Sequence, residues 1–412
     1  MKRIIICMDG TWQSLDQPKM TNIGIIARSV AHKETQADGS QIHQMVIYTR
    51  GVGSSMLALD QPTWFDKVSA SFNRFAGGAF GEGLEDGILD TYLRLAFNYE
   101  AGDEIYIFGF SRGAYAARRL TGLINTAGIV SRRYVDMARP AIRLYYRKPK
   151  DDASDVEKQD FEREAAAFRR DYGKGDRNED GTRRATDDVP RVKYLGVFDT
   201  VEQRGMSEVW ASMTPWKEKR GRFGFSNLRV SPNVDNARHA VAIDESRIGF
   251  PCALWEGIEE DNTRLGRRAY AQRWFVGSHG DVGGGGSDVL SAAALKWIAE
   301  GARDAGLRFY ATYGEDKSPL DEALQKAGYD APISRPVLAK AWQPINYPWR
   351  ARRIWPGKNK PSLADAEGML DEAAFQRANA EKLRPRYRPT PLRPFTNVLR
   401  EWREARDRSA HH

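Results

Sequence analysis

Short apolar runs alternate with helical segments along the first 300 residues, and this alternation predicts an α/β fold. The runs are rich in branched and aromatic side chains and too short for helices, so they indicate strands. They lie at residues 4–8, 45–49, 105–108, 192–198, 240–243 and 273–276. Apolar positions at helical spacing lie between and after them, at residues 84–99, 114–124 and 292–305. We therefore expect a mostly parallel central sheet with helices on both faces.

Two stretches depart from this alternation. Between about residues 131 and 190 charges crowd together and a polar, glycine-bearing loop follows, which indicates a helical insertion beside the sheet. From Tyr347 onward the chain is rich in arginine, proline and tryptophan. We expect one main domain over residues 1–345, which contains the insertion, and a basic C-terminal extension over residues 346–412. The extension suits either of two roles, resting on anionic lipid or covering the flank of the core.

The chemical centre of the pattern is the turn after the strand at 105–108. Residues 109–113 read Gly-Phe-Ser-Arg-Gly, a G-x-S-x-G motif, and a helix rich in small residues begins at once. Strand, sharp turn and helix form the context of a nucleophile elbow, in which the central serine sits in a strained backbone conformation. Ser111 is therefore the candidate nucleophile of an α/β-hydrolase-like fold. The alternative is a Gly-Ser turn without chemistry.

Backbone amides near Ser111 are the candidates for stabilising a developing oxyanion. The amide of Arg112 lies at the positive end of the new helix. A second donor is expected from the loop after an early strand, where Gly10 and Thr11 follow Asp9. Asp9 resembles part of a phosphatase Asp-x-Asp-Gly-Thr motif, but Cys7 occupies the position of the nucleophilic aspartate. Alternatively, Asp9 and Thr11 only build a tight turn.

An acid and a base are needed downstream of the serine. Asp199, at the end of the next strand, is the preferred acid by strand order, and Asp244, after a later strand, competes with it. Among the six histidines, His279 follows the last core strand in a glycine-rich loop, so it fits the order serine, acid, histidine. His239 starts a strand and suits a packing role. Asp281 is a secondary candidate, as a loop organiser or ion ligand.

Composition excludes several classes of protein but does not identify a substrate. The 412 residues are 41% apolar, carry a net charge of +8 and include two cysteines, which form no disulfide framework or zinc cluster. No run approaches a membrane span, and the first apolar run is too short for a signal-peptide core, so we expect cytoplasmic synthesis. The basic charge suits an anionic surface. A glycine- and aromatic-rich stretch at 51–83 suits either a lid or acyl-binding rim, or a packed loop.

Five blocks in order resemble one known family. They are residues 9–12, 109–114, 196–201, 238–245 and 277–285, and the closing Tyr387-Arg388-Pro389 also matches. The family consists of α/β-hydrolases whose best-known members are phospholipase effectors of bacterial type VI secretion, of the first lipase class. The resemblance covers about residues 1–310. It implies that Ser111, Asp199 and His279 take the nucleophile, acid and base positions, and that the activity is hydrolysis of a phospholipid acyl ester.

The resulting prediction is a serine hydrolase of the phospholipase A type that needs no metal or organic cofactor. Its expected partners are an acyl-ester lipid and, by the resemblance, the secretion machinery and an immunity protein, with export by type VI secretion. Peripheral contact with an anionic membrane fits the basic tail, and no nucleic acid is expected. The rival functions are a soluble carboxylesterase and a catalytically silent binding or adaptor module.

Overall fold

The structure, a computed structural model, places most of the chain. It describes residues 1–10, 13, 15, 17–51, 80–150, 152–175, 188–201, 228–247, 250–313, 316–334, 351–355, 357, 359–383 and 386–409. Several sequence predictions therefore lie outside the described residues: Thr11, most of the aromatic stretch at 51–83, the tip of the insertion, and the boundary expected near residue 345.

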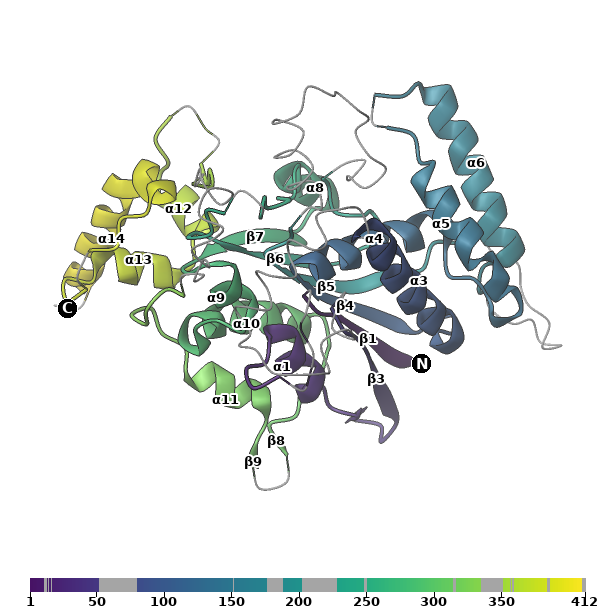
Figure 1. The fold of residues 1–412 in the computed structure, drawn as a ribbon, viewed down its shortest axis with the longest axis horizontal. Helices are drawn as coiled ribbons and strands as arrows, with labels where there is room; N and C mark the ends of the chain where they lie inside the picture. The colour runs from purple at the N-terminus through teal and green to yellow at the C-terminus, as the bar shows by residue number, and fades with distance from the viewer. Residues whose placement is uncertain are drawn as a thin grey trace.

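A seven-stranded sheet runs through the centre of the described molecule (Figure 1). Its order is β2–β3–β1–β4–β5–β6–β7, and all neighbours are parallel except β2 and β3. The strands are β1 (Lys2–Met8), β2 (Lys33–Thr35), β3 (Gln41–Thr49), β4 (Glu104–Phe110), β5 (Val192–Phe198), β6 (Ala237–Ala242) and β7 (Tyr270–Phe275). A separate small hairpin joins β8 (Thr312–Tyr313) and β9 (Asp316–Lys317). The mostly parallel sheet predicted from the apolar runs is confirmed.

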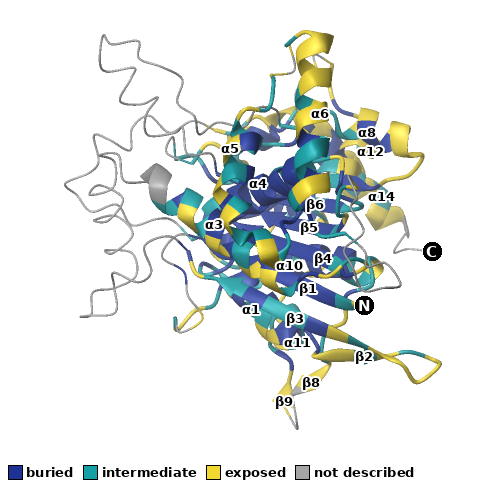
Figure 2. Ribbon diagram, turned by 90° about the vertical axis from the view of Figure 1, so that its right-hand side faces the viewer, coloured by how far each residue is buried: buried dark blue, intermediate teal, exposed yellow. Residues whose placement is uncertain are grey.

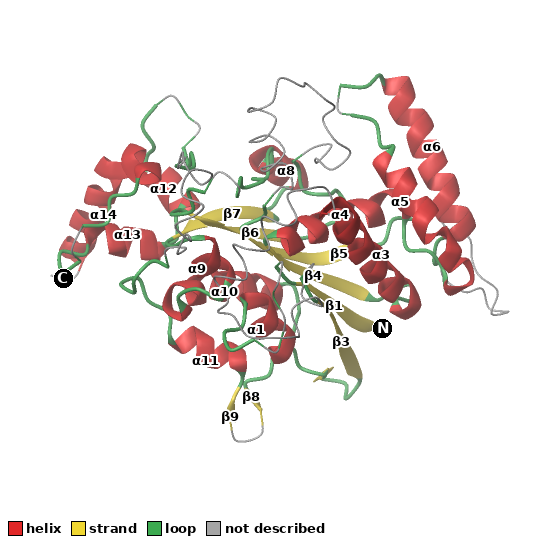
Figure 3. Cartoon of the chain, in the orientation of Figure 1, coloured by secondary structure: helices red, strands yellow, loops and turns green. Residues whose placement is uncertain are grey.

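Helices cover both faces of the sheet, as Figure 3 shows. One face carries α3 (Phe80–Asn98), α4 (Arg112–Ala127), η2 (Arg132–Met137), α5 (Ala138–Tyr146) and α6 (Asp155–Tyr172). The opposite face carries α1 (Asn22–Ser29), α10 (Asp288–Asp304) and α11 (Pro319–Gln325). Two short helices, α8 (Ile258–Leu265) and α9 (His279–Gly283), flank β7 in the chain.

Alternation along each strand divides the core between these two helical layers. In β1, Ile4 and Ile6 pack on the side of α3 and α4, whereas Ile5 and Cys7 pack on the side of α1 and α10. All four side chains are fully buried. A strand whose two faces are both apolar fits only in the middle of such a sandwich, which is why β1 and β4 are central (Figure 2).

The C-terminal part of the chain packs against the β7 end of the sheet. It contains α12 (Leu363–Met369), α13 (Glu372–Asn379), η4 (Thr390–Phe395) and α14 (Thr396–Ser409). A third hydrophobic cluster joins these helices to Val241 of β6 and Trp274 of β7. Trp274 also forms a parallel backbone bridge with Leu370. The arginine-rich C-terminal region therefore has an apolar inner surface that the sequence did not reveal.

Three element boundaries differ from the pattern of apolar and charged residues. Between residues 131 and 190, Ser154 caps α6 and forms a capping box with Glu157, so the helix starts at Asp155 and not at the first crowded charges. The strand expected at 45–49 is longer, because residues 41–44 pair with β1 or β2 despite their polar side chains. His279, expected in a loop, is the first residue of α9.

Candidate active site

Ser111 occupies a strained turn between β4 and α4. Its φ of 57° and ψ of −121° are rarely adopted by residues with a side chain. The turn is possible because two glycines flank it. A Cβ on Gly109 would lie 2.6 Å from Ala114 Cα, and a Cβ on Gly113 would lie 2.1 Å from the carbonyl oxygen of Met8. The motif thus produces the elbow that it predicts.

His279 lies directly beside this serine. Its Nε2 is 2.8 Å from Ser111 Oγ, and its Nδ1 is 2.6 Å from Asp199 Oδ2. The ring is held between two aromatic side chains, with centroid distances of 4.7 Å to Phe110 and 5.0 Å to Phe250. Because an Nδ1 proton is donated to Asp199, Nε2 is left to accept the serine hydroxyl proton.

Asp199 closes this line from the end of β5, and its backbone is also strained, with φ of 39°. Its side chain is fully buried, and Oδ1 accepts the amide of Ala242 at 3.0 Å. Burial opposes ionisation of the carboxyl group, but the Arg352 guanidinium and the hydrogen bond from His279 outweigh it. Together they hold the pKa of Asp199 well below its usual range. Asp199 is therefore a carboxylate at all ordinary pH values.

The competing acid, Asp244, has a different environment. Its Oδ2 accepts the amide of Gly277 at 2.8 Å and the hydroxyl of Tyr387 at 2.8 Å. Burial raises the pKa of Asp244, and these two donors offset only part of that effect. Asp244 thus links Gly277, two residues before His279, to Tyr387 of the C-terminal region. Asp199, by contrast, contacts the imidazole of His279.

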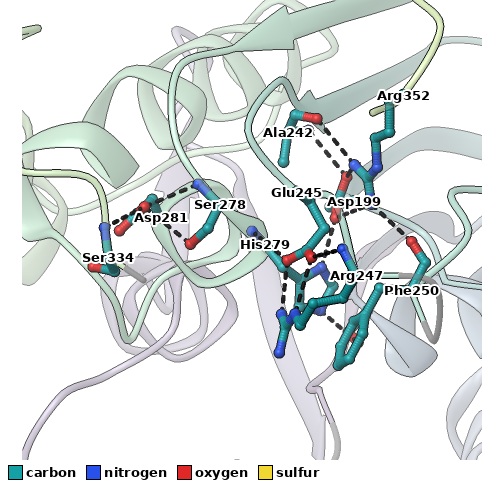
Figure 4. A network of polar contacts seen from close by, with 11 residues as sticks. Asp199, Ala242, Glu245, Arg247, Phe250, Ser278, His279, Asp281, Ser334 and Arg352 are labelled. Carbon is teal, nitrogen blue, oxygen red and sulfur yellow. Dashed lines mark hydrogen bonds and ion pairs between the residues drawn. The ribbon is translucent and has the colours of Figure 1, made fainter. Parts of the chain in front are cut away.

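Asp281 organises the start of α9, where His279 lies. The carboxylate is fully buried; Oδ2 accepts the amide and hydroxyl of Ser278 and the amide of Ser334, and Oδ1 accepts the amide of Ser287. In Figure 4 it points away from the histidine ring. Within the described residues, no group of three or more histidine, cysteine or acidic side chains is arranged to hold a metal ion.

The first strand supplies the other candidate residues. Asp9 is buried, and its carboxylate accepts the hydroxyls of Tyr48 and Thr21 and the amide of Gly10, at 2.7 to 2.8 Å. Burial raises the pKa of Asp9 to about 6, although these three donors lower it. Because the Gly10 amide is already hydrogen-bonded to Asp9, it would have to exchange that partner to serve an oxyanion.

The backbone of Arg112 forms the first turn of α4, next to the serine. This is the position predicted for an oxyanion donor. Burial lowers the pKa of the Arg112 side chain to about 9. The first turn of a helix directs its amides toward the N-terminal end, so the location suits a developing negative charge.

His239 is a structural histidine. It is fully buried in β6, where Nε2 accepts the amide of Thr200 at 3.2 Å and Nδ1 lies 2.9 Å from Gln272 Oε1. Burial, followed by the charge of Arg118, lowers its pKa to about 3, so the ring is neutral. The His239 ring therefore holds the backbone of Thr200, the residue after Asp199. This contact agrees with the packing role expected for His239.

Sequence reasoning missed two sets of contacts around Asp199 and His279. Arg352, which we assigned only to the basic tail, reaches Asp199 from the C-terminal region. Glu245 accepts the backbone amide of His279 at 3.3 Å and pairs with Arg247 at 2.7 Å. Nothing in the local sequence distinguishes Arg352 or Glu245 from a surface charge, because Asp199 lies 153 positions from Arg352 and His279 lies 34 positions from Glu245.

No helix of the described part of the chain has both the length and the apolar character to cross a membrane. The chain shares 27% identity over 249 residues with the uncharacterized protein YEL023C of Saccharomyces cerevisiae, covering 60% of this chain and 32% of that protein. It therefore spans about a third of the length of this curated relative.

Two solved structures are also similar. An uncharacterized protein from Pseudomonas aeruginosa matches with a TM-score of 0.38 and 16% identity over 80% of this chain and 49% of that one. The Tle1 effector bound to the VgrG spike of the type VI secretion system matches with a TM-score of 0.36 and 16% identity, over 69% and 51% of the two chains.

The family model described as the catalytic domain of the Tle1-like phospholipase effectors of type VI secretion matches residues 2–301. This range contains Ser111, Asp199 and His279, and it confirms the resemblance seen in the five sequence blocks. The chain belongs to the Tle1-like family of type VI secretion phospholipase effectors.

Proposed function

We propose that the protein is a serine hydrolase that cleaves the acyl ester of a phospholipid, with phospholipase A-type specificity. The observation that carries the proposal is the continuous line of hydrogen bonds from Ser111 Oγ through His279 to Asp199. Membership in a phospholipase effector family supports the lipid substrate. Strain at both Ser111 and Asp199 supports a functional role for this line, since such backbone cost is concentrated at functional sites.

The reaction follows from the geometry. Ser111 Oγ attacks the ester carbonyl carbon while His279 Nε2 takes its proton, and Asp199 stabilises the imidazolium that forms. The tetrahedral oxyanion is stabilised at the N-terminus of α4 by the amide of Arg112. His279 then returns the proton to the leaving lysolipid alcohol, which leaves an acyl-serine. Water, deprotonated by the same imidazole, hydrolyses it to the free fatty acid and restores Ser111.

The remaining oxyanion donor belongs to the loop after β1. Gly10 supplies it if its amide is released from Asp9, and Thr11, outside the described residues, is the other candidate. Protonation of Asp9 weakens its hold on the Gly10 amide, so an exchange of partners costs less when the carboxyl group is neutral.

Partners and export belong to the same proposal. A phospholipid bilayer presents the ester, and the type VI secretion machinery would deliver the protein to a target cell, where an immunity protein would be its counterpart. The chemistry itself uses only side chains and backbone amides of the chain.

Fatty acid release from vesicles of defined phospholipids tests the proposal. The wild-type protein is expected to release fatty acid from phosphatidylethanolamine or phosphatidylglycerol vesicles, and Ser111→Ala is expected to lower the rate by about a thousandfold or more. Ser40→Ala, an exposed serine in the turn between β2 and β3, is the matched control and should retain full activity. Equal release by the wild type and Ser111→Ala would refute a serine hydrolase. Hydrolysis of nitrophenyl butyrate without vesicle hydrolysis would instead favour a soluble carboxylesterase.

A further inference from the structure

Arg352 contacts the acid of the triad although it lies in the C-terminal region. Its two terminal nitrogens lie 2.5 Å from Asp199 Oδ1 and 3.1 Å from Asp199 Oδ2, a bidentate arrangement (Figure 4). The same nitrogens also donate to the carbonyl oxygens of Ala242 and Phe250, each at 3.0 Å. The guanidinium is thus fixed by Asp199 and by the segment from Ala242 to Phe250, both distant from Arg352 in sequence, and it can occupy only a narrow range of positions.

The carboxylate of Asp199 is consequently shared. Oδ2 accepts both Arg352 and the imidazole of His279, while Oδ1 accepts Arg352 and the amide of Ala242. Each oxygen of the carboxylate thus accepts two hydrogen bonds. Its rotation is therefore restricted, and the ring of His279 is held toward Ser111.

The charged side chains beside the His279 ring are also paired with opposite charges. Among the residues that the structure describes, the charged and titratable side chains around His279 are Asp199 after β5, Glu245, Arg247 and Cys252 after β6, Arg352 from the C-terminal region, and Asp281 of its own helix. They form two opposite-charge pairs, Asp199 with Arg352 and Glu245 with Arg247. Burial together with the neighbouring negative charge of Asp199 raises the pKa of the Cys252 thiol, so that group is neutral. Asp281 points away from the ring (Figure 4).

A carboxylate beside a histidine favours the protonated imidazole, and a positive charge on the same carboxylate opposes that effect. We propose that Arg352 is a positioning residue of the triad: it orients Asp199 against His279 and offsets the negative charge of that carboxylate, so that the imidazole is held ready to accept the serine proton. This inference rests on the proposed function.

Two substitutions separate orientation from charge. Arg352→Gln removes the charge, so the acid limb of the pH–rate profile is expected to move to higher pH by about one unit or more. Arg352→Lys keeps the charge but loses the planar fork, so its limb should stay near the wild-type position while the plateau rate falls about tenfold. Arg353→Gln removes the same charge from the neighbouring, exposed position and should match the wild type in both respects.

The measurement is the second-order rate of fluorophosphonate labelling of Ser111 in the full chain between pH 4.5 and 9, with circular dichroism as the check of folding. If wild-type Ser111 does not label, or labels without an acid limb, the proposed function fails. If the wild type titrates but Arg352→Gln has the same midpoint, the inference about Arg352 fails. It also fails if Arg353→Gln shifts the midpoint equally. Should Arg352→Gln not fold, Arg352→Lys decides: a wild-type plateau rate, or a midpoint shifted by a full unit, overturns the inference.

Discussion

At the scale of single residues, the site is defined by backbone strain and by buried charge. Ser111 and Asp199 are the two non-glycine positions in the described residues with a left-handed φ, and both contact His279. Each such conformation costs about 1 to 3 kcal/mol and persists only where surrounding structure imposes it. Here the imposing structure is the close approach of β1 and α4 for the serine, and the paired strand β6 for the aspartate, whose amide donates to Ala240 at 2.7 Å.

The buried, neutral ring of His239 predicts that the stability of the fold depends on pH. Its pKa is about 3 in the folded chain, below the ordinary value of 6.5, so the unfolded chain binds one more proton between these values. The neutral ring makes its full contribution to the free energy of unfolding above about pH 6.5, and this contribution is lost as pH falls toward 3. The total contribution is several kcal/mol.

His239→Gln should therefore flatten part of the acid limb of the stability curve, with a smaller loss of unfolding free energy between pH 6.5 and 4 than the wild type shows. Urea unfolding at a series of pH values measures this. Val156→Ala, at an exposed position of α6 without a titratable group, is the control and should leave the slope unchanged. A wild-type slope in His239→Gln would show that the ring already carries a proton in the fold.

At the scale of elements, the elbow depends on how closely α4 approaches β1. Gly113 is in the first turn of α4, and an added Cβ would overlap backbone atoms of Met8 and Asp9 at 2.1 and 2.4 Å. Backbone atoms of a central strand cannot move aside as a flexible side chain can.

Gly113→Ala is expected to destabilise the fold by about 3 kcal/mol or more and to displace Ser111 from His279. Gly368→Ala, at an exposed glycine in α12 with open space around it, should be neutral or stabilising by up to about 1 kcal/mol. Chemical denaturation of both variants is the measurement. Comparable stability of the two would mean that strand and helix are farther apart than described.

At the scale of the whole molecule, the C-terminal region and the central sheet share a hydrophobic cluster. Phe395 is fully buried in it, along with Phe375 and residues of β6 and β7. Arg352 connects the same region to Asp199. We therefore expect the C-terminal region, proposed from sequence as an extension, to unfold together with the site.

Phe395→Ala removes a large ring from that cluster and should cost about 3 to 5 kcal/mol. Loss of helical circular dichroism and loss of fluorophosphonate labelling are then expected at the same, lowered temperature. Val156→Ala, at an exposed position of α6, is the control and should change stability by less than about 0.5 kcal/mol. An active, labelled protein whose C-terminal helices have already melted would contradict this coupling.

The sequence predicted those features whose cause is local. Apolar runs located the core strands because buried parallel strands need apolar side chains on both faces, as in β1 and β4. The G-x-S-x-G motif located the elbow because a side chain at either of its glycines would overlap neighbouring backbone atoms, and both glycines lie within the five residues of the motif. The proximity of Ser111, Asp199 and His279 followed from strand order, since carboxyl ends of parallel strands share one edge of the sheet.

Features that depend on contacts between residues far apart in the chain were not predicted. Strand β2 is a short polar edge strand whose pairing comes from its neighbour β3, not from its own pattern. Arg352 resembles the other arginines nearby, and only the fold shows that it is directed at a buried carboxylate. Asp244 follows a strand as Asp199 does, and its contact with Tyr387, 143 positions away, distinguishes its role.

The central claim is that Ser111 is activated through His279 by Asp199, and the labelling rate of Ser111 by a fluorophosphonate tests it most directly. Peptide mapping should place the label on Ser111 of the wild type. The rate should fall by about a thousandfold or more in Asp199→Asn and by less than about tenfold in Asp244→Asn. A wild-type rate in Asp199→Asn, or a label on any other residue, would contradict the account.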